Sequence, residues 1–150
     1  MRIVAQRVSQ ASVSIAGQVT AKISNGILLL VGIEHEDDKS DADWLVRKIT
    51  QLRIFNDADG IMNRSVMDTG GDLLVVSQFT LHGSTRKGNR PSYIRAAKHE
   101  HTVPLYEYFI DQIRALSSLK VETGTFAADM QVALINDGPV TLIIDSKSRE

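Results

Sequence analysis

The sequence contains no cysteine, no long apolar run and almost no net charge, and each absence excludes a class of protein. Without cysteine the chain has no disulfide, no thiolate nucleophile and no cysteine-based zinc site. No stretch approaches the roughly eighteen apolar residues of a membrane-spanning helix. Residues 1–7 follow the pattern of a strand and not that of a signal peptide. We therefore expect a soluble, cytoplasmic protein with no membrane partner.

The near-zero net charge limits how this protein can bind nucleic acid. Seventeen Lys and Arg oppose eighteen Asp and Glu, which leaves a formal net charge of −1. The molecule as a whole therefore does not attract a polyanion, and any contact with RNA must be local. A length of 150 residues with 43% hydrophobic residues fits one compact unit, so we assign residues 1–150 to a single domain.

Hydrophobic periodicity predicts elements in the order strands, helix, strands, helix, strands. Residues 10–23 alternate as a hairpin, and residues 27–33 form a continuous apolar strand. A helix follows with Ser40 as its expected N-cap, and a second helix is expected to start at Thr102 with an early Pro104. Further short strands are expected at residues 52–55, 119–123, 130–135 and 140–145. This mixture is typical of an α/β domain.

Residues 72–81 combine a buried strand with polar side chains at its end. The four apolar residues 73–76 predict a strand that is buried on both faces. They lead without a turn signal into Ser77, Gln78 and Thr80, so a rigid element delivers two hydroxyls and an amide at one place. A strand that simply ends in polar residues at a sheet edge is the alternative interpretation.

No catalytic base or metal site can be assigned from the histidines. The four histidines match no zinc-ligand spacing on a predicted helix, so neither a metal nor a cofactor is expected; they are His35, His82, His99 and His101. Hydroxyl nucleophiles are available in Ser77 and Thr80, but no partner base can be named and a Gly-x-Ser-x-Gly motif is missing. The strand end therefore suits binding and oxyanion stabilisation, unless its polar groups only satisfy neighbouring backbone.

Residues 82–93 are the least regular part of the chain. They include two glycines and a proline together with Arg86, Lys87 and Arg90. Flexible backbone and clustered cations next to the strand end predict a loop that contacts phosphate. A solvated loop with incidental charge fits the composition equally well.

Gly138-Pro139 is the other unusual feature of the sequence. Proline gives the preceding peptide bond an appreciable chance of being cis, and glycine allows close approach because it has no Cβ. Together the two residues could present bare carbonyls to a ligand. An ordinary tight turn between the last two strands is the simpler interpretation, and the dipeptide alone favours it.

Two motifs closely resemble those of the D-aminoacyl-tRNA deacylases. The first is Ser-Gln-Phe-Thr at residues 77–80, and the second is Asn-Asp-Gly-Pro-Val-Thr at residues 136–141. Either motif alone is weak, but the pair in this order and at this separation is specific. The similarity runs through nearly the whole chain and includes residues 52–55, 62–66, 88–91 and 123–126.

The resemblance implies an enzyme that hydrolyses the ester between a D-amino acid, or glycine, and the 3′-terminal adenosine of tRNA. Its partner would be the acceptor end of a tRNA that carries such a group. The resemblance also implies a cytoplasmic homodimer with an α/β fold. In that fold two β-sheets form a barrel-like sandwich, and helices pack on the outer face to give β/β/α layers.

The resemblance assigns Ser77, Gln78, Phe79 and Thr80 to the catalytic pocket. In the mechanism that we favour, the Phe79 backbone N–H stabilises the oxyanion while water attacks with help from the 2′-hydroxyl of the substrate. This RNA-assisted route explains why no catalytic triad is found. Thr80 as a covalent nucleophile is the competing mechanism.

The resemblance assigns Gly138 and Pro139 to a chiral filter. Their cis peptide would reach into the active site of the partner subunit and reject the L-aminoacyl group. Phe126 and Met130 would contact the terminal adenine, and Arg7 would help to hold the Gly-Pro element. Glycine is expected directly after Phe126, where this chain has alanine.

Two other functions stay open at this point. One is a dimer that binds RNA ends without chemistry, supported by the cations in residues 86–98. The other is an esterase for small molecules that uses Ser77 or Thr80 as nucleophile. The missing base argues against the second.

Overall fold

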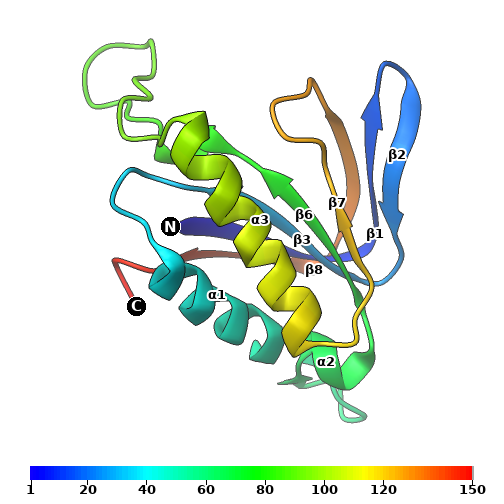
Figure 1. The fold of residues 1–150 in the computed structure, drawn as a ribbon. Helices are drawn as coiled ribbons and strands as arrows, with labels where there is room; N and C mark the ends of the chain where they lie inside the picture. The colour runs from blue at the N-terminus through cyan, green and yellow to red at the C-terminus, as the bar shows by residue number, and fades with distance from the viewer. Residues whose placement is uncertain (150) are drawn as a thin grey trace.

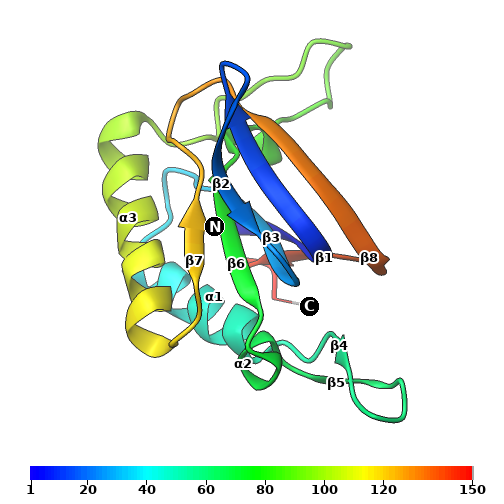
Figure 2. The same ribbon diagram turned by 90° about the vertical axis from the view of Figure 1, so that its right-hand side faces the viewer.

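The computed structural model describes residues 1–149 and contains a six-stranded sheet, a two-stranded sheet and helices packed outside (Figures 1 and 2). The large sheet has the order β2-β1-β3-β6-β7, and β8 pairs with the other edge of β1. Its strands are β1 (Arg2–Ile15), β2 (Gln18–Ile23), β3 (Gly26–Gly32), β6 (Asp72–Ser77), β7 (Val121–Thr123) and β8 (Gln131–Asp145). The small sheet contains β4 (Phe55–Asn56) and β5 (Met62–Arg64). The helices are α1 (Lys39–Gln51), α2 (Val66–Thr69) and α3 (His99–Leu116), with a 3-10 turn η1 (Phe79–His82) after β6.

The long strand β1 joins two parts of the large sheet. Its residues 2–8 pair with β3, its residues 11–15 pair with β2, and β8 runs along its opposite edge. Because the strands curve over this length, the sheet rolls up and is nearly closed into a barrel (Figure 2). The expected barrel-like arrangement with helices outside is confirmed, and its two walls belong to one continuous sheet.

The parallel pair β3 and β6 forms the centre of the sheet, as the uninterrupted apolar sequences predict. Leu73, Leu74, Val75 and Val76 of β6 are 0–1% exposed, so this strand is buried on both faces. Leu73 and Val75 pack under the helices, whereas Leu74 and Val76 pack inside the barrel. Burial of one such side chain contributes about 1.5–3 kcal/mol, which makes β6 a rigid support for the residues that follow it.

The helices α1 and α3 cover the same outer face of the sheet (Figure 1). Their apolar faces supply Leu45 and Ile49 from α1 and Phe109 and Ile113 from α3, and all four side chains are fully buried. The core therefore has two layers, one between sheet and helices and one inside the barrel. Within residues 1–149, no helix combines the length and the apolar character needed to cross a membrane.

Helix α1 starts at a different cap from the one that we predicted. The N-cap is Asp38, whose carboxylate accepts from the Ser40 N–H at 2.8 Å and from the Asp41 N–H at 3.4 Å. Asp41 in turn accepts from the Asp38 N–H at 3.0 Å, which completes a capping box. The prediction of Ser40 was wrong because a nearby carboxylate interacts more favourably with the positive helix N terminus.

Helix α3 starts at His99, earlier than the cap that we predicted at Thr102. The Thr102 hydroxyl donates to the Ala97 carbonyl at 3.1 Å, so it fixes the helix start from inside the first turn. Pro104 lies within the helix, and it cannot donate an N–H to the Glu100 carbonyl. We predicted a late start for α3 because proline is common in the first turn of a helix. In α3 the proline instead lies after the first turn.

The C-terminal strand differs most from the prediction. Residues 131–145 form the single strand β8 instead of two strands separated by a tight turn. Asn136 pairs with Val8 and Thr141 pairs with Gln6, so residues 137–140 bulge opposite the one residue Arg7. The bulge was not predicted because its pairing partner lies at the other end of the sequence.

The short strands were predicted incompletely. Of the strand expected at residues 52–55 only Phe55 lies in a strand, β4, which continues to Asn56, and the strand expected at residues 119–123 is reduced to β7. The partner of β4 is β5, which was not predicted. All residues of β5 are exposed, so they carry no hydrophobic signal.

Candidate active site

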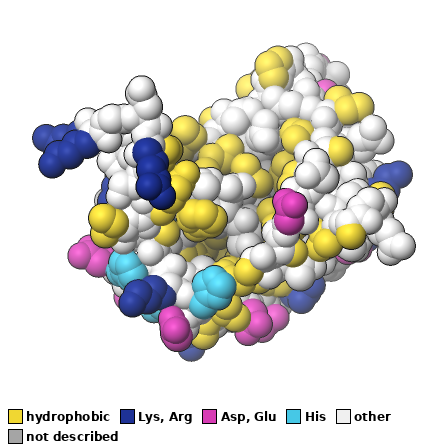
Figure 3. Space-filling view, turned by 90° about the horizontal axis from the view of Figure 1, so that it is seen from above, with side chains coloured by type: hydrophobic (Ala, Val, Ile, Leu, Met, Phe, Trp, Pro, Cys, Tyr) yellow, Lys and Arg dark blue, Asp and Glu magenta, His cyan; other side chains and the backbone are white. Residues whose placement is uncertain are grey.

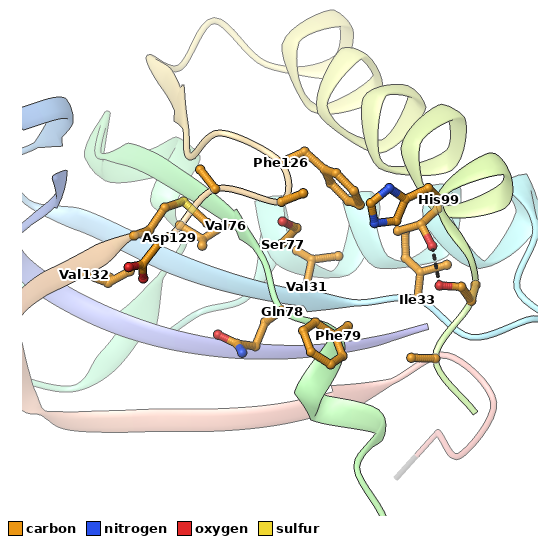
Figure 4. Close-up of a pocket in the computed structure, with 16 residues that line it drawn as sticks. Val31, Ile33, Val76, Ser77, Gln78, Phe79, His99, Phe126, Asp129 and Val132 are labelled. Atoms are coloured by element: carbon orange, nitrogen blue, oxygen red, sulfur yellow. Dashed lines mark hydrogen bonds between the residues drawn. The ribbon is translucent and has the colours of Figure 1, made fainter. Parts of the chain in front are cut away.

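A pocket of about 570 Å³ opens at the carboxyl ends of β3 and β6. Because these strands are parallel, they end at the same edge of the sheet, and the start of α3 and residues 126–132 close the other sides (Figure 4). Hydrophobic side chains gather in the hollow when the molecule is seen from above (Figure 3). Pockets of about 300–1,000 Å³ hold small organic ligands, so this one has the size of a ligand site.

The predicted catalytic motif lies along one wall of the pocket. Ser77, Gln78 and Phe79 line it, whereas Thr80 lies beyond the lining residues. The Gln78 N–H donates to the Val31 carbonyl at 2.7 Å, which extends the pairing of β3 and β6 past the end of β6. The chain then turns directly into η1. The motif is therefore held by a strand whose residues 73–76 are all buried.

Close packing fixes η1 against the sheet. A Cβ at Gly32 would lie 2.9 Å from the Leu81 Cβ and 3.1 Å from the Gln78 carbonyl oxygen, so only glycine fits without displacement. Arg2 holds the turn from its other end, since its Nη1 donates to the Leu81 carbonyl at 2.9 Å and its Nε donates to Asp145 at 2.9 Å. The turn therefore has little freedom to move.

The Phe79 backbone N–H is an unused donor at the pocket wall. Within residues 1–149 it has no hydrogen-bond acceptor, because it follows the last bond of the strand and precedes the first bond of η1. The Phe79 ring is 57% exposed and stands edge-to-face against Tyr93, with the ring centroids 5.1 Å apart. An unpaired N–H in this position can bind a carbonyl oxygen or an oxyanion.

Thr80 has a hydrogen-bond neighbour that cannot act as its base. The Gln78 side-chain amide donates to the Thr80 hydroxyl. An amide NH₂ group cannot take the proton that a nucleophilic hydroxyl must lose. In the part of the chain that the structure describes, no carboxylate or imidazole is hydrogen-bonded to Thr80. The geometry therefore offers no activation of this hydroxyl.

Phe126 and Met130 line the opposite side of the pocket. The Phe126 ring packs edge-to-face against His99 with centroids 5.2 Å apart (Figure 4). The Tyr106 ring also packs against Phe126, with centroids 6.0 Å apart. The next residue, Ala127, has a φ of 60°, which is the left-handed region that favours glycine. This backbone conformation accounts for the glycine that the resemblance led us to expect.

His99 and Asp129 also line the pocket, and the sequence had assigned a role to neither. His99 is the first residue of α3, so the late helix start that we predicted left it in a loop. Ligands in parallel sheets bind outside the carboxyl ends of the strands. A prediction that α3 begins at His99 would therefore have identified His99 as a candidate pocket residue.

Two buried side chains lie next to the predicted catalytic motif, one on α3 and one in η1. The Tyr106 hydroxyl donates to the Val75 carbonyl at 3.0 Å, and burial raises its pKa, so it stays protonated as a donor. His82 is 1% exposed, and neither ring nitrogen has a hydrogen bond within residues 1–149. Its Nδ1 lies 3.8 Å from Glu34, which Arg95 holds at 2.7 Å. These contacts connect the strand end to α3 and to the segment after η1.

Gly138 and Pro139 are not among the residues that line the pocket of their own chain. They belong to the bulge in β8, and their peptide bond is cis. Arg7 fixes the bulge, since its Nε donates to the Asp137 carbonyl at 3.0 Å and its Nη1 donates to the Ile54 carbonyl at 2.7 Å. Gly138 has a φ of 131°, and a Cβ there would lie 3.0 Å from the Arg7 Nη2. The predicted site residues thus fall into a pocket and a separate bulge.

Residues 1–149 contain no group of three His, Asp or Glu side chains placed to hold a metal ion. Among the histidines, the His101 Nε2 contacts the Asp37 carbonyl at 2.8 Å, His82 is buried and His99 faces Phe126. The pocket itself is lined by the His99 imidazole, the Asp129 carboxylate, hydroxyls, the Gln78 amide and apolar surface.

Comparison with known proteins points to one family. The family model described as D-Tyr-tRNA(Tyr) deacylase matches residues 4–145. The chain is 57% identical over 150 residues to proteins named D-aminoacyl-tRNA deacylase from Bacteroides thetaiotaomicron, Flavobacterium johnsoniae and Chromobacterium violaceum. Each of these alignments covers 100% of both chains.

Two solved structures have a similar fold. A protein described as c-Myc DNA Unwinding Element Binding Protein matches with a TM-score of 0.92 and 40% identity, over 97% of this chain and 98% of that chain. A probable eukaryotic D-amino acid tRNA deacylase matches with a TM-score of 0.81, over 95% of this chain and 97% of that chain. Because its identity is 15%, the second match is informative about the fold alone.

Proposed function

The chain belongs to the D-Tyr-tRNA(Tyr) deacylase family, and we propose from this premise that it removes D-amino acids from tRNA. As a member of the family it is a hydrolase that acts on a carboxylic ester bond. The proposed bond joins the carboxyl group of a D-amino acid, or of glycine, to the 3′-terminal adenosine. The observation that carries the proposal is the unused Phe79 N–H on the wall of a pocket large enough for an aminoacyl-adenosine.

Hydrolysis at this site needs little help from side chains, because an aminoacyl ester is already activated. Water attacks the carbonyl carbon with assistance from the 2′-hydroxyl of the terminal ribose, and the Phe79 N–H stabilises the oxyanion. The bond between the carbonyl carbon and O3′ then breaks, and the proton lost by water goes to O3′. The products are the free amino acid and a tRNA with a free 3′-hydroxyl.

The aromatic side of the pocket is proposed to hold the terminal adenine. Phe126 and Met130 provide apolar surface there, and His99 extends it with a ring at a right angle to Phe126. Adenine placed on this side brings the ester toward residues 77–79 on the facing wall. Binding energy would then come from the RNA end, which every substrate shares, and not from the variable amino-acid side chain.

Gly138 and Pro139 are proposed to select the D-amino acid. An enzyme that accepts many side chains cannot build a pocket for each, so it must bind the common α-amino group and exclude the L hand by contact. Rigid backbone carbonyls suit both tasks, because a wall that yielded by an ångström would admit the L substrate. The two hydrogen bonds from Arg7 to the Asp137 and Ile54 carbonyls support the required rigidity.

This role requires a second copy of the chain, because the Gly-Pro bulge does not line its own pocket. We therefore propose a homodimer in which the bulge of one subunit enters the pocket of the other. Surface residues near both elements favour such contact, since Ile143 of β8 is 72% exposed and Phe79 is 57% exposed. An edge strand with exposed apolar side chains is a surface that another chain can cover. The proposed substrate places the enzyme in the cytoplasm, where tRNA is aminoacylated.

A chirality-resolved assay tests the proposal. Purified protein is incubated with D-tyrosyl-tRNA and, separately, with L-tyrosyl-tRNA, and release of the amino acid is followed. We expect rapid release from the D substrate and no release above the spontaneous rate from the L substrate. Intact D-tyrosyl-tRNA together with hydrolysed L-tyrosyl-tRNA would contradict the proposal. Glycyl-tRNA in the same assay tests the achiral substrate.

A second candidate function is nucleic-acid binding without chemistry. The cations of residues 86–98 favour it, as does the 40% identity to a protein described as binding a DNA element. It predicts retained tRNA binding with no release of amino acid in the assay above. An esterase that uses Ser77 or Thr80 would instead hydrolyse simple esters without tRNA, but neither hydroxyl has a hydrogen-bonded base within residues 1–149.

A further inference from the structure

Residues 84–92, here called the basic arm, project from the body of the molecule between η1 and α3 (Figure 1). The base of the arm is closed by Ser84 and Ser92, whose N–H groups donate to each other's carbonyls at 2.8 and 2.9 Å. Near the tip, Gly88 has a φ of 70°, and a Cβ at this residue would meet no atom within 4 Å, so the chain reverses there in open space. The basic arm therefore presents its side chains to solvent from a fixed base.

The basic arm has a positive charge that the protein does not compensate. Arg86, Lys87 and Arg90 are exposed, and none forms an ion pair in the part of the chain that the structure describes. Residues 83–98 contain no Asp or Glu. Several cations elsewhere do have acidic partners, as Arg2 has in Asp145 and Lys147 has in Asp41. Clustered like charges repel one another and create a local positive potential, which a polyanion would neutralise.

Both ends of the basic arm are attached to the rim of the pocket. On one side, the Gly83 N–H donates to the Thr80 carbonyl at 2.9 Å. On the other side, Tyr93 packs against Phe79, and the Ala97 N–H donates to the Ile33 carbonyl at 3.0 Å. Figure 3 shows Lys and Arg side chains on the part of the surface that projects beside the hollow. The cations are thus placed beside the pocket without lining it.

From these observations we propose that Arg86, Lys87 and Arg90 bind backbone phosphates of the tRNA acceptor stem while the 3′-terminal nucleotide occupies the pocket. The proposal rests on the proposed function, since it places an RNA end in that pocket. It reconciles a net charge of −1 with an RNA substrate, because the attraction is concentrated at one point next to the site. The contact is to phosphates, so it is independent of sequence.

The test compares a long and a short substrate. The variant Arg86→Gln/Lys87→Gln/Arg90→Gln is assayed on D-tyrosyl-tRNA and on D-tyrosyl-adenosine, which lacks the stem. A matched control, Lys22→Gln/Arg47→Gln/Arg53→Gln, removes three exposed cations that do not line the pocket. We expect the arm variant to lose kcat/KM on the tRNA only, and the control to match the wild type on both substrates. Thermal melting of all three proteins checks that the fold is kept.

Salt dependence gives the expected size of the effect. Each phosphate contact in a duplex contributes about 0.9 to the slope of log affinity against log salt. Loss of three contacts should therefore flatten this slope by about 2.7, which is about 40-fold between 50 and 200 mM salt. Arg86→Lys/Arg90→Lys keeps the charges and should keep the slope.

The outcomes separate this proposal from the proposed function. Equal loss on both substrates, or no loss on the tRNA, overturns the role of the basic arm. A wild-type protein that hydrolyses neither substrate overturns the deacylase function, and binding of uncharged tRNA then tests the arm by itself. Unchanged tRNA binding by the arm variant would show that its charges serve another partner, such as an acidic protein surface.

Discussion

The Phe79 backbone N–H is the group on which the proposed chemistry depends most directly. Phe79→Pro removes this donor and should lower kcat by about 10²–10³-fold, the usual effect of losing one oxyanion donor. Proline suits the first position of a helical turn, and Gln78 before it is already extended, with φ of −146° and ψ of 84°. Phe79→Ala keeps the N–H and is the matched control. Single-turnover hydrolysis of D-tyrosyl-tRNA measures both variants, and equal rates would contradict the role of the N–H.

The Thr80 hydroxyl separates two ways of breaking the ester. If water is the nucleophile, Thr80→Ala should keep kcat within about threefold of the wild type, because the amide partner of the hydroxyl cannot act as a base. If Thr80 were acylated during the reaction, the same change would abolish turnover while Thr80→Ser would retain it. Steady-state kcat of the two variants on D-tyrosyl-tRNA distinguishes these results.

At this scale, the sequence identified some pocket residues and missed others. Ser77 and Gln78 could be placed because residues 73–76 before them are all apolar, whereas Phe79, Phe126 and Met130 were named from the family resemblance. His99 could not be placed, because its position in the pocket depends on where α3 begins and on how α3 crosses the edge of the sheet. Both depend on tertiary packing, which hydrophobic periodicity does not report.

At the scale of elements, the start of α1 depends on a carboxylate network. The Asp41 side chain accepts from the Asp38 N–H at 3.0 Å and from the Lys147 ammonium at 2.8 Å. Burial is the largest single influence on Asp41 and raises its pKa, but hydrogen bonds from Lys147, Asp38 and Ser146 together hold the pKa below the ordinary 3.8. The charged form therefore stabilises the fold above that pH, and this contribution is lost as pH falls through the lowered pKa.

Asp41→Asn should accordingly lower stability at neutral pH by about 1–2 kcal/mol, since it weakens the cap and removes a charged hydrogen bond. Its stability should also fall less than that of the wild type when the pH is lowered past 3.8. Thermal melting between pH 7 and pH 3 measures both effects. Asp59→Asn, in an exposed turn, is the control, and a variant that followed the wild-type pH profile would contradict the assignment.

The elements that the sequence predicted well are those whose burial repeats along the chain. The β1–β2 hairpin, β3 and β6 were all expected from alternating or continuous apolar residues. The β8 bulge and β5 have no such repeat, because exposed residues and a distant partner strand define them. Local sequence therefore predicted the central layers of the fold, and long-range pairing determined the rest.

At the scale of the whole molecule, the proposed dimer can be tested by mixing two inactive variants. Phe79→Pro damages the pocket, and Gly138→Ala damages the bulge, because a Cβ there would lie 2.8 Å from the Val140 Cγ2 and the φ of 131° is unfavourable for alanine. In a mixed dimer, the intact bulge of the first variant meets the intact pocket of the second. Subunit exchange should therefore restore up to about a quarter of the wild-type activity.

The control for this experiment is each variant alone, which should stay inactive at every protein concentration. Failure of the mixture to recover activity, in samples where mixed dimers are detected by a size-shifted tag, would contradict the shared site. Activity of either variant alone would also contradict it, because a shared site needs both the pocket and the bulge. Size-exclusion chromatography with light scattering determines the oligomeric state independently.

The bulge in β8 divides the pairing between β8 and β1 into two stretches. Residues 131–136 pair with β1 on one side of it, and residues 141–145 pair with β1 on the other side. The ladder thus resumes after the bulge, so substitutions within residues 137–140 can change the projecting surface while the barrel keeps its register. The proposed filter for the D hand is thus structurally separate from the core, and exchange of this short segment should alter which amino acids are removed without redesign of the core.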